Sequence, residues 1–278
     1  MLVRDAPDAP AGIEVFMLRR NLSSVFVAGA FVFPGGAVDA EDRDDDISAL
    51  VEGVEEVRAN VRLGRDEGAL GFWIAAIRES FEEAGVLLAR DARSGEHASL
   101  EVVAGLTAAR DAVARGEQSF ADVVRQHGLV LDGGCLRVFG HWITPSPAPR
   151  RYDTWFFLAP APVGHAYVHD EGETIASRWV RPAEALAQAR RQELELIYPT
   201  YRSIEALSRF DSTLTLFDAV DAAWRDPADA LREVEGARAW QIRLPGDDHD
   251  VAERAADAVA HSTTSHRRRA AAPTSGAG

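Results

Sequence analysis

This chain has little of what a secreted, membrane-embedded or nucleic-acid-binding protein needs. Its 278 residues include one cysteine, Cys135, so an intrachain disulfide is excluded and a reducing compartment is favoured. No run of 18 or more apolar residues is present to span a membrane, and no amino-terminal apolar stretch suits a signal peptide. Acidic residues outnumber basic ones by 44 to 30, and the net charge of −14 argues against nucleic acid as the main partner. We therefore expect a cytoplasmic protein without membrane or nucleic-acid partners.

Residues 78–86, with the sequence RESFEEAGV, carry the most informative pattern in the chain. Glu79, Glu82 and Glu83 stand at spacings i, i+3 and i+4, which places their carboxylates on one face of a helix. Three crowded like charges destabilise a bare helix, but a divalent cation above them offsets the repulsion, and Mg²⁺ prefers carboxylate oxygens. A solvated acidic helix face would produce the same spacing and stands as the alternative.

The opposite face of this segment predicts a helix that is packed and fixed. Apolar residues recur at spacings of three and four, namely Leu70, Trp73, Ile74, Ile77, Phe81 and Ala84. Gly85 follows in the position where a helix commonly ends in the left-handed conformation. The acidic face is therefore predicted to belong to a rigid element, as a preorganised metal site requires.

Upstream lies a short apolar strand over residues 30–33, which Pro34, Gly35 and Gly36 end in a tight turn. The order of strand, glycine turn, acidic residues and a helix with the pattern Arg-Glu-x-x-Glu-Glu-x-Gly resembles the Nudix hydrolase family. The signature of that family is Gly-x5-Glu-x7-Arg-Glu-U-x-Glu-Glu-x-Gly-U, where U is a bulky aliphatic residue.

Most positions of the signature are matched, and two differ. Gly36 takes the first glycine, Asp42 stands where the family usually has Glu, and Ser80 replaces an aliphatic residue. Residues 43–77 separate Asp42 from Arg78, which makes 35 residues where the signature has seven. A surface insertion of this kind costs little closure entropy, about 0.6 kcal/mol per doubling of loop length. Split signatures occur in a branch of the family that includes a peroxisomal coenzyme A diphosphatase of animals, and weaker similarities extend from about residue 12 to 248.

The resemblance implies an α/β fold, a Nudix-like α/β/α sandwich with a mixed sheet and helical insertions. We expect one domain over residues 1–246, with insertions at about 43–70 and 91–128, and a disordered tail over 247–278. Residues 1–10 are expected to be an irregular lead. The apolar pattern predicts strands at 13–18, 138–143, 154–158, 177–180 and 239–244, and helices at 183–189, 193–208 and 214–223.

The resemblance also implies roles for the signature residues. The metal ligands would be Glu79, Glu82, Glu83 and the backbone of Gly36, and the cofactor would be Mg²⁺ or Mn²⁺. Arg78 would orient the carboxylates through bidentate pairing, with Asp42 supporting it. The catalytic set is Glu82, Glu83 and Arg78; which glutamate acts as general base is left open.

Three further residues are candidates for contacts with the substrate. Arg19 and Arg151 could bind phosphate oxygens, because a guanidinium group suits bidentate phosphate contact. Glu173, in an acidic loop, could be a further ligand or base. An ordinary surface role is the alternative for each of them.

The implied reaction is metal-dependent hydrolysis of a diphosphate linkage in a small-molecule nucleotide conjugate. Coenzyme A or acyl-coenzyme A is the leading substrate by analogy, with ADP-ribose or NADH as alternatives. A catalytically silent nucleotide sensor and an interaction scaffold are the competing classes. The two insertions could shape a substrate pocket, a docking surface or the contact of a homodimer.

Overall fold

The computed structural model describes residues 1–8, 10–21, 29–144, 146, 151–163, 167, 174–245 and 247. The strands are β1 (Leu2–Asp5), β2 (Ile13–Arg20), β3 (Phe31–Val32), β4 (Val51–Glu52), β5 (Ala89–Asp91), β6 (Leu129–Asp132), β7 (Arg137–Ile143), β8 (Asp153–Pro160), β9 (Thr174–Val180), β10 (Leu231–Glu233) and β11 (Ala239–Ile242). The α-helices are α1 (Asp45–Ser48), α2 (Glu56–Leu63), α3 (Leu70–Ala84), α4 (Leu100–Gly105), α5 (Thr107–Ala114), α6 (Phe120–Gln126), α7 (Pro182–Arg190), α8 (Tyr198–Leu207) and α9 (Thr213–Ala223). The described residues also contain the 3₁₀ turns η1 (Glu41–Arg43) and η2 (Gly133–Cys135).

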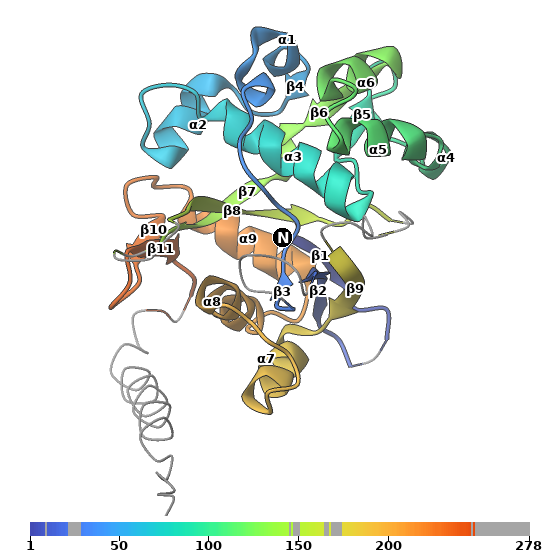
Figure 1. Ribbon diagram of the computed structural model, residues 1–278. Coiled ribbons are helices and arrows are strands. Elements are labelled where there is room, and N and C mark those ends of the chain that lie inside the picture. Colours follow the sequence, from blue (N-terminus) through green and yellow to red (C-terminus); the bar gives the residue numbers. More distant parts are fainter. Residues whose placement is uncertain are drawn as a thin grey trace, which may run out of the picture.

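A large mixed sheet forms the centre of the molecule. Its strands follow the order β10-β11-β7-β8-β1-β2-β3, and β9 pairs with β2 outside this path. The β1–β8 pair is parallel, whereas the other pairs are antiparallel. In Figure 1, α3 lies on one side of this sheet and α7, α8 and α9 lie on the other. The predicted α/β/α arrangement with a mixed sheet is therefore confirmed.

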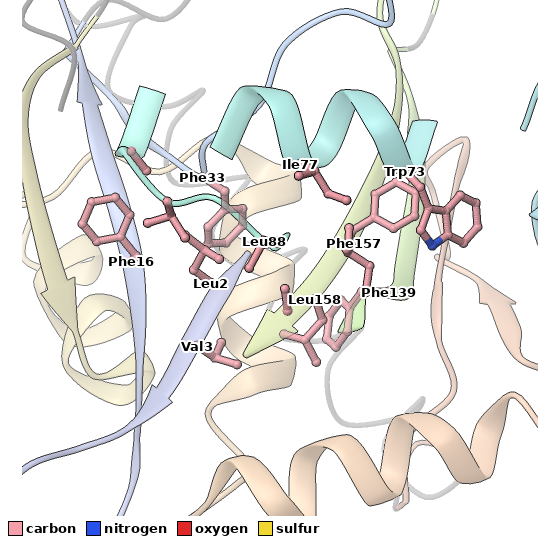
Figure 2. Close-up of a cluster of buried hydrophobic side chains, with 14 of the residues drawn as sticks. Leu2, Val3, Phe16, Phe33, Trp73, Ile77, Leu88, Phe139, Phe157 and Leu158 are labelled. Carbon is pink, nitrogen blue, oxygen red and sulfur yellow. The ribbon is translucent and has the colours of Figure 1, made fainter. Parts of the chain in front are cut away.

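The apolar face of α3 packs against the sheet, as its spacing predicts. Trp73 and Ile77 are fully buried on the sheet side of α3, where Trp73 lies beside Phe157 of the sheet (Figure 2). The Trp73 and Phe157 rings meet edge to face with their centroids 4.7 Å apart. Burial of each such side chain is worth about 1.5–3 kcal/mol relative to exposure, so this face holds α3 firmly on the sheet.

A second sheet, which the sequence did not predict, joins the two expected insertions. Its order is β4-β6-β5, with β4 parallel and β5 antiparallel to β6. β4 comes from residues 43–70, and β6 directly follows residues 91–128. The larger of the two buried apolar clusters includes side chains from both sheets, so the insertions share one core with the central sheet.

The predicted strands and helices from residue 138 to residue 244 are found with shifted ends, and the largest shift is at α8, which begins at residue 198 rather than 193. The expected irregular lead is wrong. Leu2 and Val3 are buried in β1, which lies between β2 and β8. Asp247, placed at the start of the expected tail, is buried and pairs with Arg209 and Arg232. The rest of that tail lies outside the described residues. In the described part of the chain, no helix is long and apolar enough to cross a membrane.

Candidate functional site

The helix that carries the acidic face is held at both ends. At its start, the side chain of Glu56 in α2 accepts hydrogen bonds from the backbone N–H groups of Gly68, Ala69 and Leu70. A helix needs such acceptors because its first N–H groups have no partner within the helix. At its end, Gly85 takes the left-handed conformation with φ 65° and donates its N–H to the Phe81 carbonyl. The glycine cap predicted from the sequence is therefore present.

Arg78 is the centre of the polar cluster on this helix. It is only 7% exposed and donates from Nε and Nη2 to both oxygens of Asp42, at 3.0 and 2.9 Å. Its Nη1 donates to Oε1 of Glu79 at 2.9 Å and to Oε1 of Glu82 at 3.0 Å. Nη2 also reaches the Ala37 carbonyl at 2.8 Å. One guanidinium group therefore joins the carboxylates of α3 to the residues that follow the glycine turn.

The glycine turn lies against the remaining carboxylates. The backbone N–H of Gly35 donates to Oε2 of Glu83 at 2.8 Å. A Cβ atom at Gly36 would lie 2.6 Å from Cδ and 2.7 Å from Oε2 of Glu79, which is far inside ordinary contact distance. The backbone at Gly36 can approach Glu79 this closely because glycine has no side chain.

Burial and neighbouring charges together shift the pKa values of the side chains in this cluster. Burial, reinforced by the charges of Glu82 and Asp39, raises the pKa of Glu79 to about 7 despite the opposing attraction of Arg78. Burial raises the pKa of Glu82 in the same direction. Burial alone would lower the pKa of Arg78, but its hydrogen bonds and charge contacts with the carboxylates raise it instead. The guanidinium group thus stays charged, while burial makes the neighbouring carboxylates easier to protonate than in water.

The carboxylates face Arg78 and the glycine turn rather than one common point. Among the described residues, no group of three or more His, Cys, Asp or Glu side chains is arranged to hold a metal ion. Arg78 holds Glu79 and Glu82, while Glu83 is turned toward Gly35. The predicted ligands are thus brought to one helix face and one turn, without a closed coordination shell.

A polar cavity of about 850 Å³ lies next to Arg78 and Glu82. Its walls come from both predicted insertions, since Asp44 and Ile47 belong to the first and Val113 and Phe120 to the second. The second insertion is tied directly to α3, because Nε of Arg110 in α5 donates to the Glu82 carbonyl at 2.8 Å. The insertions therefore build a wall beside the cluster.

The other predicted site residues are placed less centrally. Arg19 is exposed on β2, where its Nε donates to the Gly29 carbonyl at 3.3 Å. Arg151 is exposed beside the start of β8, and its Nε donates to the Thr144 carbonyl at 3.1 Å. Glu173 lies outside the described residues. The described contacts of Arg19 and Arg151 do not join either one to the carboxylate cluster.

Sequence reasoning missed two groups that support the cluster. Asp39 places Oδ2 3.3 Å from Nη2 of Arg78, and Arg110 fixes the backbone of Glu82. Asp39 was visible as one of the acids after the glycine turn. Arg110 carried no signal, because it is one of several arginines in residues 91–128 and its contact is with a distant backbone.

The lone cysteine is not a candidate nucleophile. Cys135 is half-buried, and burial together with the charge of Asp132 raises its pKa to about 12. A thiol in this state is protonated at neutral pH, whereas nucleophilic attack requires the thiolate. Cys135 therefore has the character of a structural residue.

Comparison with known proteins assigns the chain to a family. The model of a family described as the NUDT19 Nudix domain matches residues 66–207, which is about half of the chain and includes α3. This chain belongs to the Nudix family. The Nudix fold is shared with a solved structure, a NUDIX hydrolase from Alicyclobacillus acidocaldarius, with a TM-score of 0.60 and 25% identity. That likeness covers 78% of this chain and 93% of the other.

Three animal relatives are acyl-coenzyme A diphosphatases named NUDT19. Identity is 28% to the protein of Homo sapiens and 31% to that of Gallus gallus, each over 74% of this chain. The Xenopus laevis protein is 25% identical over 84% of this chain and 70% of its own length. The chain spans 63% and 64% of the length of the human and chicken proteins.

Proposed function

We propose that this Nudix protein hydrolyses the diphosphate linkage of coenzyme A or acyl-coenzyme A in a metal-dependent reaction. The observation that carries the proposal is the Arg78-centred cluster of α3 carboxylates beside the Gly35–Gly36 turn. Similarity to acyl-coenzyme A diphosphatases supports the choice of substrate within the Nudix family.

The donor atoms of the cluster fit a hard divalent cation. Glu79, Glu82 and Glu83 offer carboxylate oxygens, and Gly36 offers a backbone carbonyl, which suit Mg²⁺ or Mn²⁺. The raised pKa values of Glu79 and Glu82 mark carboxylates whose charged form burial disfavours. A bound cation would supply positive charge to that face and to the diphosphate oxygens.

The residues of the cluster would have different roles in the reaction. Arg78 acts as a positioning residue, because it fixes two carboxylates through Nη1 and is itself fixed by Asp42. Glu82 or Glu83 takes a proton from the attacking water as the water oxygen bonds to phosphorus and the bridging P–O bond breaks. With coenzyme A, the products are 3′,5′-ADP and 4′-phosphopantetheine.

The remaining parts of the substrate need surfaces outside the cluster. We place the uncharged pantetheine part of the substrate in the polar cavity beside Glu82. Acidic wall residues such as Asp44 would repel the nucleotide part, which carries a further phosphate. Arg19, Arg151 and Glu173 remain proposed substrate contacts.

The proposal also covers the domain organisation, the cellular compartment and the assembly of the protein. Residues 1–246 form one Nudix domain with insertions at 43–70 and 91–128, and the shared apolar core supports this assignment. The lone, unreactive cysteine supports a reducing compartment such as the cytoplasm. A homodimer built on the insertions is the proposed assembly.

The test is a hydrolysis screen read by mass spectrometry, with and without Mg²⁺ or Mn²⁺. The panel contains coenzyme A, acyl-coenzyme A, ADP-ribose, NADH, dinucleoside polyphosphates and nucleoside triphosphates. Metal-dependent release of 3′,5′-ADP from coenzyme A is the expected result. Preferential cleavage of another conjugate would overturn the substrate, and silence of the folded protein across the panel would favour a nucleotide sensor.

A further inference from the structure

Two arginines flank one aromatic ring on the sheet face that carries α7. The guanidinium carbons of Arg19 and Arg178 each lie 5.9 Å from the centroid of the Phe31 ring. Arg19 lies opposite Phe31 in the β2–β3 pair, and Arg178 lies opposite Met17 in the β2–β9 pair. Because alternate residues of a strand share a face, all three side chains are on the same side of the sheet.

This pair of cations is without an acidic partner in the described part of the chain. Arg19 donates to the Gly29 carbonyl, and Arg178 donates from Nη1 to Oε1 of Gln188 at 3.2 Å. Among the described residues, no carboxylate lies within ion-pair distance of either guanidinium group. A glutamate, Glu184, reaches Arg178 only through the Gln188 amide. Each guanidinium group has five N–H donors, and most of these have no partner among the described residues.

The absence of acidic partners is informative because this protein is rich in acids. Acidic residues outnumber basic ones by 14, and several arginines elsewhere form ion pairs, as in the contacts of Arg4 with Glu14 and Arg90 with Asp132. Beside one ring, two guanidinium groups without an acidic partner in the described part of the chain form a local positive site in a negative molecule. Guanidinium groups bind phosphate oxygens bidentately, and two of them suit a group with two negative charges.

The location links this site to the proposed active site. β3 leads from Phe31 directly to the glycine turn, where Gly35 contacts Glu83. Gly35 comes four positions after Phe31, a span of at most about 14 Å in an extended chain. Arg178 lies opposite Met17, and β2 runs antiparallel to β3. Along the strands, Arg178 is therefore further toward the glycine turn than Arg19. Because α3 and α7 lie on opposite sides of the sheet, an anion held here would lie across β3 from the carboxylates, near the glycine turn but distinct from the group bound at them.

We propose that Arg19 and Arg178 bind a phosphomonoester of the substrate that lies outside the diphosphate. The inference rests on the proposed function and names the chemical group it favours, the ribose phosphate that coenzyme A carries and dephospho-coenzyme A lacks. A phosphomonoester presents three acceptor oxygens and about −1.5 to −2 charges at neutral pH, which matches two guanidinium groups. The arginine pair then favours substrates that carry this additional ribose phosphate over those that lack it.

The test compares coenzyme A with dephospho-coenzyme A for the wild type, Arg19→Gln and Arg178→Gln. We expect wild-type kcat/KM to be higher for coenzyme A. Each variant should lose about tenfold more for coenzyme A than for dephospho-coenzyme A, mainly through KM, since each lost contact is a charge-assisted hydrogen bond. Arg4→Gln is the matched control, because Arg4 also lies over a ring, that of Trp179 at 4.1 Å, but is paired with Glu14. Equal losses for the two substrates in Arg19→Gln and Arg178→Gln would overturn the proposal.

A binding measurement separates this proposal from the proposed reaction. Calorimetric titration with 3′,5′-ADP and with 5′-AMP requires no turnover. Tighter binding of 3′,5′-ADP, abolished in Arg19→Gln and Arg178→Gln, supports the phosphomonoester site even if no substrate is hydrolysed. Equal affinity of the wild type for the two nucleotides contradicts it, whereas absent hydrolysis with selective binding contradicts only the proposed reaction.

Discussion

The close approach of the glycine turn to α3 gives a prediction that separates activity from folding. In Gly36→Ala, the new Cβ would lie 2.6 Å from Cδ of Glu79, whereas ordinary contacts begin near 3.4 Å. The carboxylate must therefore move by about 1 Å. Because the colliding group is the end of a flexible side chain, we expect a stability loss below about 1 kcal/mol. The same displacement at a working carboxylate costs about 100-fold in rate, so kcat should fall by about that factor.

The assay pairs steady-state hydrolysis of coenzyme A with denaturant unfolding of the same preparations. Gly105→Ala in α4 is the matched control, because its Cβ meets no atom within 4 Å and alanine favours a helix. The control should keep wild-type kcat and stability. A Gly36→Ala enzyme with near wild-type kcat would refute the view that Glu79 works from its position against the turn.

Three other predictions concern the same cluster. Asp42→Ala leaves the buried Arg78 with fewer partners, so it should lower the free energy of unfolding, measured by urea titration, by about 3 kcal/mol. A loss below about 0.5 kcal/mol would contradict the role of Asp42 in holding Arg78. The raised pKa of Glu79, about 7 against an ordinary 4.5, means that its contribution to stability is complete below pH 4.5 and is lost as the pH rises through about 7. In the presence of a chelator, the free energy of unfolding of Glu79→Gln should therefore rise relative to that of the wild type as the pH increases across this range. The difference should reach about 3 kcal/mol, at 1.36 kcal/mol per pKa unit. Parallel profiles of unfolding free energy against pH for the two proteins would argue against a buried carboxylate at this position. Millimolar Mg²⁺ or Mn²⁺ should raise the wild-type melting temperature more than that of Glu83→Gln, and no shift in either protein would favour the solvated acidic face.

Local patterns carried the prediction of α3. Its apolar face repeats at helical spacing over fifteen residues, and Gly85 supplies the residue type that a left-handed cap needs. Most strands of the central sheet after residue 137 were also predictable, because their apolar runs are bounded by proline, glycine or polar residues.

Long-range pairing explains what the sequence did not reveal. β1 is four residues long and gains its place from contacts with β2 and β8, the latter more than 150 residues away. β4, β5 and β6 have two to four residues each, too few to show a period, and β4 and β6 meet only because two insertions pack together. Strands of this kind depend on tertiary context rather than on local propensity.

The site shows the same division between local and distant information. Helical spacing placed Glu79, Glu82 and Glu83 on one face without further help. The pairing of Arg78 with Asp42 bridges 36 positions, and only the family resemblance pointed to it. The position of Arg178 on the same face as Arg19 follows from strand register, which the sequence alone does not define.

The most direct test of the account is the rate at which 3′,5′-ADP forms from coenzyme A in the presence of Mn²⁺. Wild type, Glu83→Gln and the exposed control Glu101→Gln in α4 would be compared at equal concentration, with folding checked by melting temperature. The account predicts metal-dependent release by the wild type and the control, and a rate lower by several orders of magnitude in folded Glu83→Gln. No release by the folded wild type, or near wild-type release by Glu83→Gln, would contradict it.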